Sequence, residues 1–343
     1  MKLSVERRTV RLRKPLETAH GTVEERELVM VTLADEEGPT GYGEAAPLEQ
    51  YDGVSVTRVE NALERYRDAL GNTQGMSGVQ IVEACRREDD LPQALAAIDM
   101  ALWDRAGRRA NKPVANLLTD DPTGEVSVNA TIGATDRRGA AEQAQAAAEA
   151  GYGCIKVKVG TGDDAARVAA VRAAAGAEIA LRLDANGAWT VEEAVRTIEA
   201  LAPAGLELVE EPTHGLHAIR EVRERVSTRI AIDETATEHG ALGAGVADAV
   251  CLKIGSCGGI SGLLAAAALV RASGAEPYVA STLDGPLGVA AALHAAAALA
   301  SRGPVPPCGL ATLGMLEDVD DQLPARQGKI ALPLRPGLGV NPL

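Results

Sequence analysis

The pattern of hydrophobic and polar positions changes near residue 126. From there onward, short apolar runs alternate with Ala-rich stretches of helical periodicity at a spacing of about 22 to 30 residues. This alternation is typical of repeated βα units around a parallel sheet. The expected strands are Val126–Gly133, Cys154–Gly160, Ile179–Asn186, Leu206–Pro212, Arg229–Thr235, Ala249–Gly255, Ala275–Thr282 and Pro307–Leu310.

Eight such strands predict an α/β fold with a closed (β/α)8-type barrel. A doubly wound open sheet would give the same alternation, but it would more often carry a Gly-rich phosphate-binding motif after its first strand, and none is present. We therefore place a barrel domain over residues 111–315.

The chain before the barrel has a different pattern, and it predicts a small α+β domain over residues 1–110. Its strand-like stretches are Leu3–Arg13 and Glu27–Leu33, and its helical stretches are Ser55–Leu70 and Leu95–Arg109. The C-terminal segment 316–343 contains a strand-like stretch over residues 329–334, and we expect this segment to return to the first domain.

Composition and charge narrow the class of protein. The chain has 24% charged and 46% hydrophobic residues, which describes a globular protein, and the absence of Phe leaves Ala, Leu, Val and Ile to build the core. The net charge of −14 argues against a nucleic-acid or anionic membrane surface. We find no signal-peptide pattern and no run of about 18 apolar residues, so we expect a cytoplasmic protein. The five scattered cysteines are expected to be reduced thiols.

Polar residues recur where the expected strands end, at the face on which such barrels carry their chemistry. Three carboxylates stand there, at Asp184, Glu210 and Asp233, each about one βα unit from the next. Convergent buried carboxylates repel one another unless a cation neutralises them. We therefore predict a site for Mg²⁺, which prefers oxygen ligands, with Mn²⁺ as the alternative ion. Strand caps or partners of nearby lysines are the competing interpretation.

Three lysines occupy the same strand ends. Only seven of the 34 basic residues are Lys, and Lys156, Lys158 and Lys253 are among them. Residues two apart in a strand point to the same side, so Lys156 and Lys158 both face the barrel interior. Lys can lose its proton whereas Arg effectively cannot. We expect a neighbouring lysine and a divalent cation to lower a lysine pKa from about 10.4 toward 7 or 8, a cost on the order of 4 kcal/mol.

A carboxylate-bound metal flanked by two lysine sites indicates a reaction class. The metal grips a substrate carboxylate and stabilises the enediolate formed when a lysine removes the α-proton. The substrate is therefore a small carboxylate. The alternative from another class is a non-catalytic barrel that binds a carboxylate metabolite or a protein partner.

At this point the sequence resembles the enolase superfamily, in its muconate-lactonising subgroup. The resemblance rests on motifs in family order over nearly the whole chain. They are Gly41-Tyr-Gly-Glu-Ala-Ala-Pro47, Ala97-Ile-Asp-Met-Ala-Leu-Trp103-Asp104, Lys156-Val-Lys158, Asp184-Ala-Asn186-Gly187, Val209-Glu210-Glu211-Pro212, Asp233-Glu234 and Leu252-Lys253.

The resemblance implies a modified TIM barrel with an N-terminal α+β capping domain that is completed by the C-terminal segment. It also implies that Asp184, Glu210 and Asp233 bind Mg²⁺ and that Lys158 and Lys253 face the substrate from opposite sides. Lys156 would tune Lys158 or contact the substrate carboxylate. Asn186 and Glu234 would support these groups from behind. A His after the seventh strand, as in the mandelate-racemase branch, is absent, and His294 is expected to be a packed core residue.

The reaction within the subgroup is harder to choose. Dipeptide epimerases carry an Asp-x-Asp pair at the eighth strand, whereas this chain has Cys308-Gly-Leu-Ala-Thr312. That segment and Ser281-Thr-Leu-Asp284 look more like o-succinylbenzoate synthase, a dehydratase of menaquinone synthesis. Ser281, Thr282, Asp284 and Gly309 are therefore expected to contact substrate.

The same two lysines would also serve a dipeptide epimerase or an N-acylamino acid racemase, and muconate cycloisomerisation is a third alternative. The loops Thr18–Glu25 and Leu48–Val54 are expected to set specificity. Whether the chain forms a homo-oligomer is left open.

Overall fold

The computed structural model describes residues 1–18, 21–35, 38–133, 136–160 and 162–343. The N-terminal part begins with an antiparallel sheet in the order β1-β2-β3. Its strands are β1 (Lys2–Thr18), β2 (Gly21–Ala34) and β3 (Gly41–Ala45). The sequence pattern predicted two shorter strands, Leu3–Arg13 and Glu27–Leu33. The observed strands extend into the polar stretch between them, and Leu16 of β1 lies opposite Val23 of β2. Backbone pairing in a hairpin does not need apolar side chains, so the polar pattern underestimated the strand length.

Five helices follow this sheet. They are α1 (Glu49–Asp52), α2 (Val56–Gly71), α3 (Gly78–Glu88), α4 (Pro92–Ala110) and α5 (Ala115–Leu118). The side chains of Ser55 and Ser77 cap α2 and α3. Helix α4 packs on β3 because glycine leaves it room: a Cβ on Gly43 would lie 1.9 Å from the carbonyl oxygen of Ala97, and Gly41 is equally confined. This close approach accounts for both glycines of the Gly41–Pro47 motif.

The barrel is built around a parallel sheet of seven strands, β5 to β11, which are neighbours in chain order. The strands of this part are β4 (Glu125–Ser127), β5 (Ala130–Ile132), β6 (Cys154–Lys158), β7 (Ala180–Asp184), β8 (Leu206–Glu210), β9 (Arg229–Ile232), β10 (Ala249–Lys253) and β11 (Glu276–Ala280). The first expected strand is therefore divided into β4 and β5. The parallel arrangement confirms the α/β class expected from the alternating pattern.

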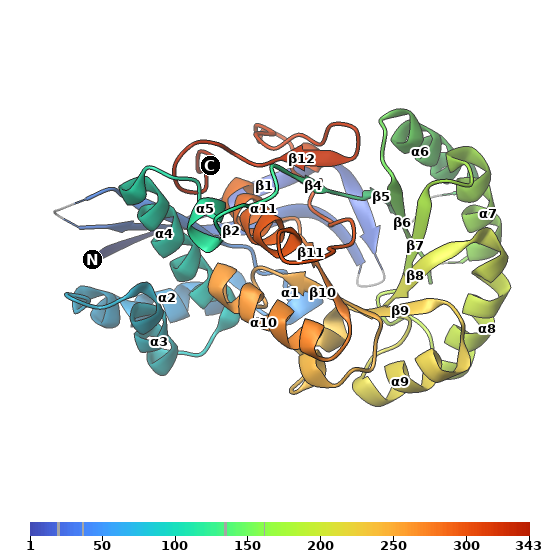
Figure 1. Ribbon diagram of the computed structural model, residues 1–343, viewed down its shortest axis with the longest axis horizontal. Coiled ribbons are helices and arrows are strands. Elements are labelled where there is room, and N and C mark those ends of the chain that lie inside the picture. Colours follow the sequence, from blue (N-terminus) through green and yellow to red (C-terminus); the bar gives the residue numbers. More distant parts are fainter. Residues whose placement is uncertain (19–20, 36–37, 134–135, 161) are drawn as a thin grey trace.

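Helices cover the outside of this sheet, and Figure 1 shows α6 to α9 outside strands β6 to β9. The α-helices are α6 (Arg137–Glu149), α7 (Asp164–Ala175), α8 (Val191–Leu201), α9 (Leu216–Arg225), α10 (Ile260–Ala272) and α11 (Pro286–Ala300). Short 3₁₀ turns are η1 (Ala202–Ala204), η2 (Glu234–Thr237), η3 (Ala241–Gly243) and η4 (Leu313–Met315).

The eighth expected strand, Pro307–Leu310, is reduced to two bridging residues. Cys308 forms a parallel bridge with Val128, and Gly309 forms one with Ala280 of β11, so the two edges of the sheet are joined there. Pro306 and Pro307 directly precede these residues, and proline has no N–H to donate to a strand ladder. A short bridging segment therefore closes the ring in place of a full strand.

The C-terminal segment contacts both parts of the molecule. Strand β12 (Lys329–Ala331) pairs with β4 at the start of the barrel, and not with the N-terminal sheet. Leu316, in contrast, forms a bridge with β1, and the backbone N–H of Leu338 donates to Asp104 of α4 at 2.8 Å. The segment thus connects the barrel to the N-terminal sheet and to α4.

Helix α11 lies in the core, and all but its last residue are buried. Its His294 is fully buried: Nδ1 accepts from the backbone N–H of Ala115 at 3.2 Å, and Nε2 lies 3.1 Å from the carbonyl oxygen of Leu338. Burial lowers the pKa of this imidazole to about 4, so the ring is neutral at pH 7. The structure confirms that His294 is a packed core residue.

Two carboxylates of the N-terminal part cap helices of the barrel. Glu44 accepts from the backbone N–H of Gly285 at 2.6 Å, at the start of α11. Asp99 of α4 accepts from the N–H of Ser261 at 3.0 Å and from its hydroxyl at 2.6 Å, at the start of α10. Trp103 adds a bond to the same hydroxyl at 2.9 Å. Both motifs that precede the barrel in sequence therefore hold helices of the barrel in place.

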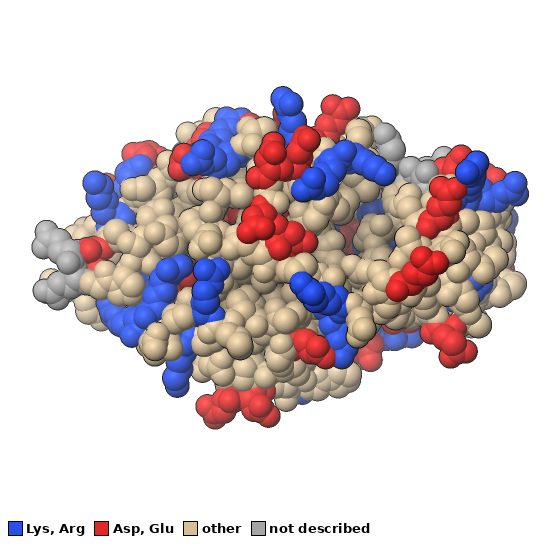
Figure 2. Space-filling model, turned by 90° about the horizontal axis from the view of Figure 1, so that it is seen from above, with Lys and Arg blue, Asp and Glu red and all other residues tan. Residues whose placement is uncertain are grey.

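The surface and the thiols agree with the composition. On the described part of the face in Figure 2, acidic and basic side chains are interspersed, and no broad basic area is visible. All five cysteines are free, and four of them are buried. Within the described part of the chain, we find no helix of the length and apolarity that a membrane crossing needs.

Candidate active site

The predicted lysines and carboxylates come together at the carboxyl ends of the barrel strands. They are Lys156 and Lys158 on β6, Asp184 on β7, Glu210 on β8, Asp233 directly after β9 and Lys253 on β10. Parallel strands of one barrel all present their carboxyl ends on the same face, so residues far apart in the chain share one location. The strand-end spacing in the sequence therefore predicted this cluster correctly.

Lys156 and Lys158 contact the carboxylates from β6. The ammonium group of Lys156 lies 2.7 Å from Oδ2 of Asp184 and 2.7 Å from Oε1 of Glu210, and so bridges them. Lys158 donates to Oδ2 of Asp184 at 2.6 Å. Asp184 and Glu210 are completely buried. A positive charge thus already lies between these two carboxylates.

Lys253 contacts the third carboxylate from a different side. Its ammonium group lies 2.7 Å from Oδ1 and 2.5 Å from Oδ2 of Asp233. Tyr51 of helix α1 completes this contact: its hydroxyl donates to Oδ1 of Asp233 at 2.9 Å and accepts from Lys253 at 2.5 Å. Tyr51 was not named from the sequence, although it lies within the loop Leu48–Val54 that we expected to set specificity.

Burial and charge oppose each other in this cluster. Burial would raise the pKa of Asp184, but the ammonium groups of Lys156 and Lys158 outweigh it, and that pKa lies well below its usual range. Burial, together with repulsion from the other carboxylates, raises the pKa of Glu210 despite the attraction of Lys156.

The pKa values of Lys156 and Lys253 shift in the opposite direction from the one expected for a lysine in this cluster. Burial would lower the pKa of Lys156 and of Lys253, yet the facing carboxylates outweigh burial and raise both pKa values above the usual lysine value. At Lys156 and Lys253, the attraction of the facing carboxylates thus outweighs the effect of burial.

Asn186 and Glu234 lie behind Lys158. Oδ1 of Asn186 accepts from Lys158 at 2.7 Å, and its Nδ2 donates to Oε1 of Glu234 at 2.9 Å. The backbone of Asn186 has a φ of 45°, a left-handed conformation that asparagine tolerates better than most residues. The turn after β7 therefore places this amide between Lys158 and Glu234.

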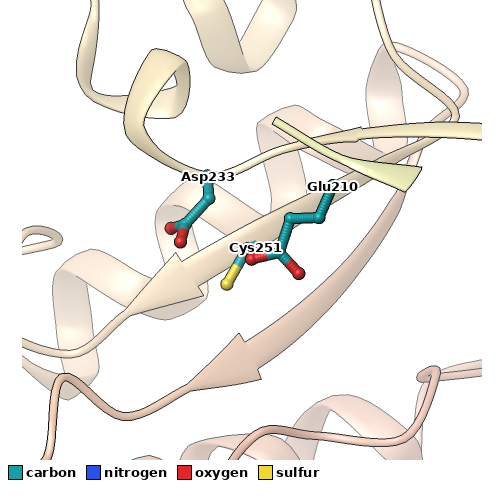
Figure 3. A group of neighbouring side chains, drawn as sticks. All are labelled: Glu210, Asp233 and Cys251. Atoms are coloured by element: carbon teal, nitrogen blue, oxygen red, sulfur yellow. The ribbon is translucent and has the colours of Figure 1, made fainter. Parts of the chain in front are cut away.

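Two further side chains of the cluster were missed from the sequence. Cys251 of β10 is buried, and single ligand atoms of Glu210, Asp233 and Cys251 all lie within 4.8 Å of one another; Figure 3 shows the three side chains gathered in one place. Tyr278 of β11 donates its hydroxyl to Oε2 of Glu210 at 2.7 Å. Cys251 precedes Lys253 by two residues and so shares its inward face, which is the only sequence signal for it.

The three buried carboxylates fit a divalent cation that prefers oxygen ligands. Asp184, Glu210 and Asp233 are buried, with relative exposures of 0%, 0% and 4%. Asp184 and Glu210 share the ammonium group of Lys156, and ligand oxygens of Glu210 and Asp233 lie within 4.8 Å of each other. Buried carboxylates gathered in this way are stabilised by positive charge, and Mg²⁺ binds oxygen ligands of this type. The sulfur of Cys251 is a soft donor that Mg²⁺ disfavours, so Cys251 is a neighbour and not part of that set.

A cavity of about 120 Å³ opens above the cluster. Of the residues expected to contact substrate, Lys156, Ser281, Thr282 and Gly309 line it. Asp284 is placed differently: its side chain is buried, Oδ1 accepts from the hydroxyl of Thr282 at 2.9 Å, and its backbone N–H donates to Ser281 at 2.8 Å. Asp284 is not among the described lining residues, so this placement fits a role in shaping the loop better than substrate contact.

Apolar side chains form part of the cavity wall. Leu16 and Val23, opposite each other in the β1–β2 hairpin, line it together with Met315 of η4. The hairpin thus brings the N-terminal sheet to the substrate side of the barrel. Ala19 and His20, within the loop expected to set specificity, lie outside the described residues.

Comparison with known families agrees with this geometry. Residues 2–119 match the model described as mandelate racemase / muconate lactonizing enzyme, N-terminal domain, and residues 139–343 match enolase C-terminal domain-like. The chain belongs to the enolase superfamily. The resemblance drawn from the sequence motifs is thereby confirmed, and the protein is an enzyme.

Relatives within the superfamily carry several activities. The hydrophobic dipeptide epimerase of Enterococcus faecalis is 33% identical over 299 residues, which are 84% of this chain and 84% of that protein. The o-succinylbenzoate synthase of Thermobifida fusca is 39% identical over 228 residues, 64% of this chain and 66% of that protein. A crystal structure of the Enterococcus faecalis epimerase, complexed with Mg and L-Leu-L-Tyr, matches with a TM-score of 0.91 at 30% identity and covers 99% of each chain. Enolase-superfamily enzymes depend on Mg²⁺, in agreement with the expected cofactor.

Proposed function

We propose that this enzyme removes a proton next to a substrate carboxylate, with Lys158 as the base and Asp184, Glu210 and Asp233 as the Mg²⁺ ligands. When bound, Mg²⁺ would neutralise these carboxylates and stabilise the negative charge that develops on the substrate. The observation that carries the proposal is the placement of two amines around the buried carboxylates. Lys158 comes from β6 and Lys253 from β10, with three strands between them.

The other polar residues support the base. Lys156 bridges Asp184 and Glu210 and holds them at a fixed separation. The amide of Asn186, held by Glu234, accepts a hydrogen bond from Lys158 and directs its amine. A proton-transfer group needs this kind of positioning because its efficiency depends on distance and angle to the reacting carbon.

For the reaction itself, we infer the syn dehydration that forms o-succinylbenzoate, a step that would serve menaquinone synthesis. Lys158 takes the α-proton, hydroxide leaves from the same face, and Lys253 stays an ammonium ion. One observation supports this choice. Among the described residues, the segments 281–284 and 308–312 line the cavity with hydroxyl and backbone groups and with no carboxylate. A dipeptide ammonium would find no counter-ion there, whereas the dehydration substrate has no ammonium.

A second candidate is the racemisation or epimerisation of an N-acylated amino acid. The acyl group removes the charge from the substrate amine, so the same uncharged wall would accept it. The presence of two lysines on different sides of the carboxylates favours this candidate, because inversion needs one group to remove a proton and another to return it.

A substrate panel separates these candidates. Purified protein with Mg²⁺ is given the cyclohexadiene precursor of o-succinylbenzoate, N-succinyl amino acids, and free dipeptides such as L-Ala-L-Glu. Dehydration is followed by absorbance, and inversion by proton exchange in deuterated solvent. We expect turnover of the cyclohexadiene precursor to exceed the others. Faster turnover of free dipeptides would contradict the argument from the missing counter-ion.

Substitution of the two lysines tests their roles. We expect Lys158→Ala to lower α-proton exchange at least about 10²-fold, because general-base catalysis is lost. Lys253→Arg should retain more activity than Lys253→Ala if Lys253 acts as a fixed cation, since Arg keeps the charge but does not transfer protons. Exchange at the wild-type rate in Lys158→Ala would remove Lys158 as the base, and equal loss in both Lys253 variants would favour inversion.

A further inference from the structure

Below the carboxylates, a line of buried polar groups runs through the barrel interior. Tyr278 on β11 has 1% relative exposure, and its hydroxyl donates to Oε2 of Glu210 at 2.7 Å. The guanidinium of Arg182 on β7, with no exposed surface, lies 5.2 Å from the centre of the Tyr278 ring. Neither residue is among the described residues that line the cavity above the cluster.

Both oxygens of Glu210 are held by different partners. Lys156 donates to Oε1 at 2.7 Å, on the side where Asp184 also lies, and Tyr278 donates to Oε2 at 2.7 Å from below. A glutamate side chain has three rotatable bonds, so a carboxylate held at only one oxygen can turn. With the hydroxyl of Tyr278 on Oε2, the carboxylate keeps Oε1 toward Asp184.

The ring of Tyr278 is itself fixed by Arg182. Arg182 donates through Nε to Glu207 at 2.7 Å and through another nitrogen to the carbonyl oxygen of Pro307 at 2.7 Å. Glu207 reaches this position because β7 and β8 change register there: Leu181 lies opposite Leu206, but Arg182 lies opposite Leu208. The skipped residue is Glu207, and a bulge of this kind turns a side chain to the other face of the strand.

We propose that Tyr278 is a positioning residue that fixes the orientation of Glu210 as a Mg²⁺ ligand, and that Arg182 in turn fixes Tyr278. The proposal rests on the assignment of Glu210 as a ligand in the proposed function. Hydrogen bonds to metal-binding carboxylates orient them, and their loss typically weakens metal affinity about 10- to 100-fold. Tyr278→Phe removes only the hydroxyl and keeps the buried ring.

Mg²⁺ binding by the full-length protein, without substrate, tests this. We expect titration calorimetry to show Mg²⁺ affinity weakened about 10- to 100-fold in Tyr278→Phe. Tyr66→Phe is the matched control, because Tyr66 is also fully buried and its hydroxyl donates to the carbonyl oxygen of Asp89 at 2.6 Å, in the N-terminal part. This control should bind Mg²⁺ as tightly as the wild type.

The outcomes are separable. Unchanged Mg²⁺ affinity in Tyr278→Phe, with only a lower unfolding temperature like that of Tyr66→Phe, overturns the proposal and leaves Tyr278 a structural residue. If Tyr278→Phe does not fold, Arg182→Lys decides: weaker Mg²⁺ binding supports the proposal, and wild-type affinity overturns it. Wild-type affinity in Glu210→Gln would instead overturn the ligand assignment, and with it the proposed function.

Discussion

Each of the three buried carboxylates has a hydrogen-bond donor besides its lysine. The donors are the backbone N–H of Asn186 for Asp184, the hydroxyl of Tyr278 for Glu210 and the hydroxyl of Tyr51 for Asp233. A carboxylate that accepts from two or more directions has little freedom to rotate. The cluster is therefore arranged before any substrate binds, and preorganised groups need no rearrangement during the reaction.

Tyr51 is the one donor of the three that comes from the N-terminal part, and its removal should be felt in catalysis. Tyr51→Phe keeps the ring, whose centre lies 3.9 Å from the ammonium of Lys253, but loses the hydroxyl that contacts Lys253 and Asp233. Because hydrogen bonds to charged groups contribute about 1.5 to 3 kcal/mol, we expect kcat/KM to fall about 10- to 100-fold. Steady-state kinetics with saturating Mg²⁺ measures this, and a wild-type value would show that the hydroxyl is dispensable.

Sequence and structure agree most closely for the residues at strand ends and least for their partners. Asp184, Glu210 and Asp233 recur at the period of the βα unit, so their convergence follows from the topology. Tyr51 and Lys253 are separated by 202 positions, and no local pattern indicates that a cap residue reaches the barrel. Tyr278 could be placed on an inward face by alternation, but which inward residue touches Glu210 depends on the twist and shear of the closed barrel.

Helices α10 and α11 depend on carboxylates from another part of the chain. Neither helix has a side-chain cap at its own N-cap residue, which is glycine in both cases. Asp99 and Glu44 provide acceptors instead. The strand pattern missed comparable long-range effects: prolines shortened the eighth strand, and the bulge at Glu207 turned inward a residue that strict alternation would place outside. Such features depend on pairing partners and not on local sequence.

Glu44, which caps α11, should make the stability of the protein depend on pH. Burial, with repulsion from Asp284, raises the pKa of Glu44 from 4.5 to about 8. Between these values the folded protein holds a proton that the unfolded chain releases, so the free energy of unfolding falls as pH rises through this window. Glu44→Gln cannot ionise, and we expect its stability to decline less than that of the wild type between about pH 5 and pH 8, which span most of that window.

Denaturant unfolding at several pH values measures this difference, with Asp90→Asn as a control because Asp90 carries an exposed carboxylate on the same part of the chain. The control should follow the wild-type curve. Parallel curves for wild type and Glu44→Gln would mean that Glu44 ionises normally inside the folded protein, and that its buried carboxylate is compensated in another way.

Three distant segments of the chain meet at one histidine. His294 in α11 joins the start of α5, through Ala115, to the C-terminal segment, through Leu338. Leu338 also donates to Asp104 of α4, so the last residues of the chain connect the barrel core to the N-terminal part. These contacts need a neutral imidazole, because only that form has one donor and one acceptor for the two backbone groups.

Acidification should accordingly weaken the folded state. Burial lowers the pKa of His294 from 6.5 to about 4, so between these values the unfolded chain binds a proton that the folded protein does not. The stabilising effect of the neutral ring is complete above the unfolded pKa, and it declines as pH falls, by on the order of 3 kcal/mol in total.

His294→Gln keeps an acceptor and a donor but does not titrate. We expect the free energy of unfolding to fall less in this variant than in the wild type from about pH 7, above the unfolded pKa, to about pH 5, below it. Equal falls would show that the imidazole is protonated within the fold, and that the contact with Ala115 does not require its neutral form.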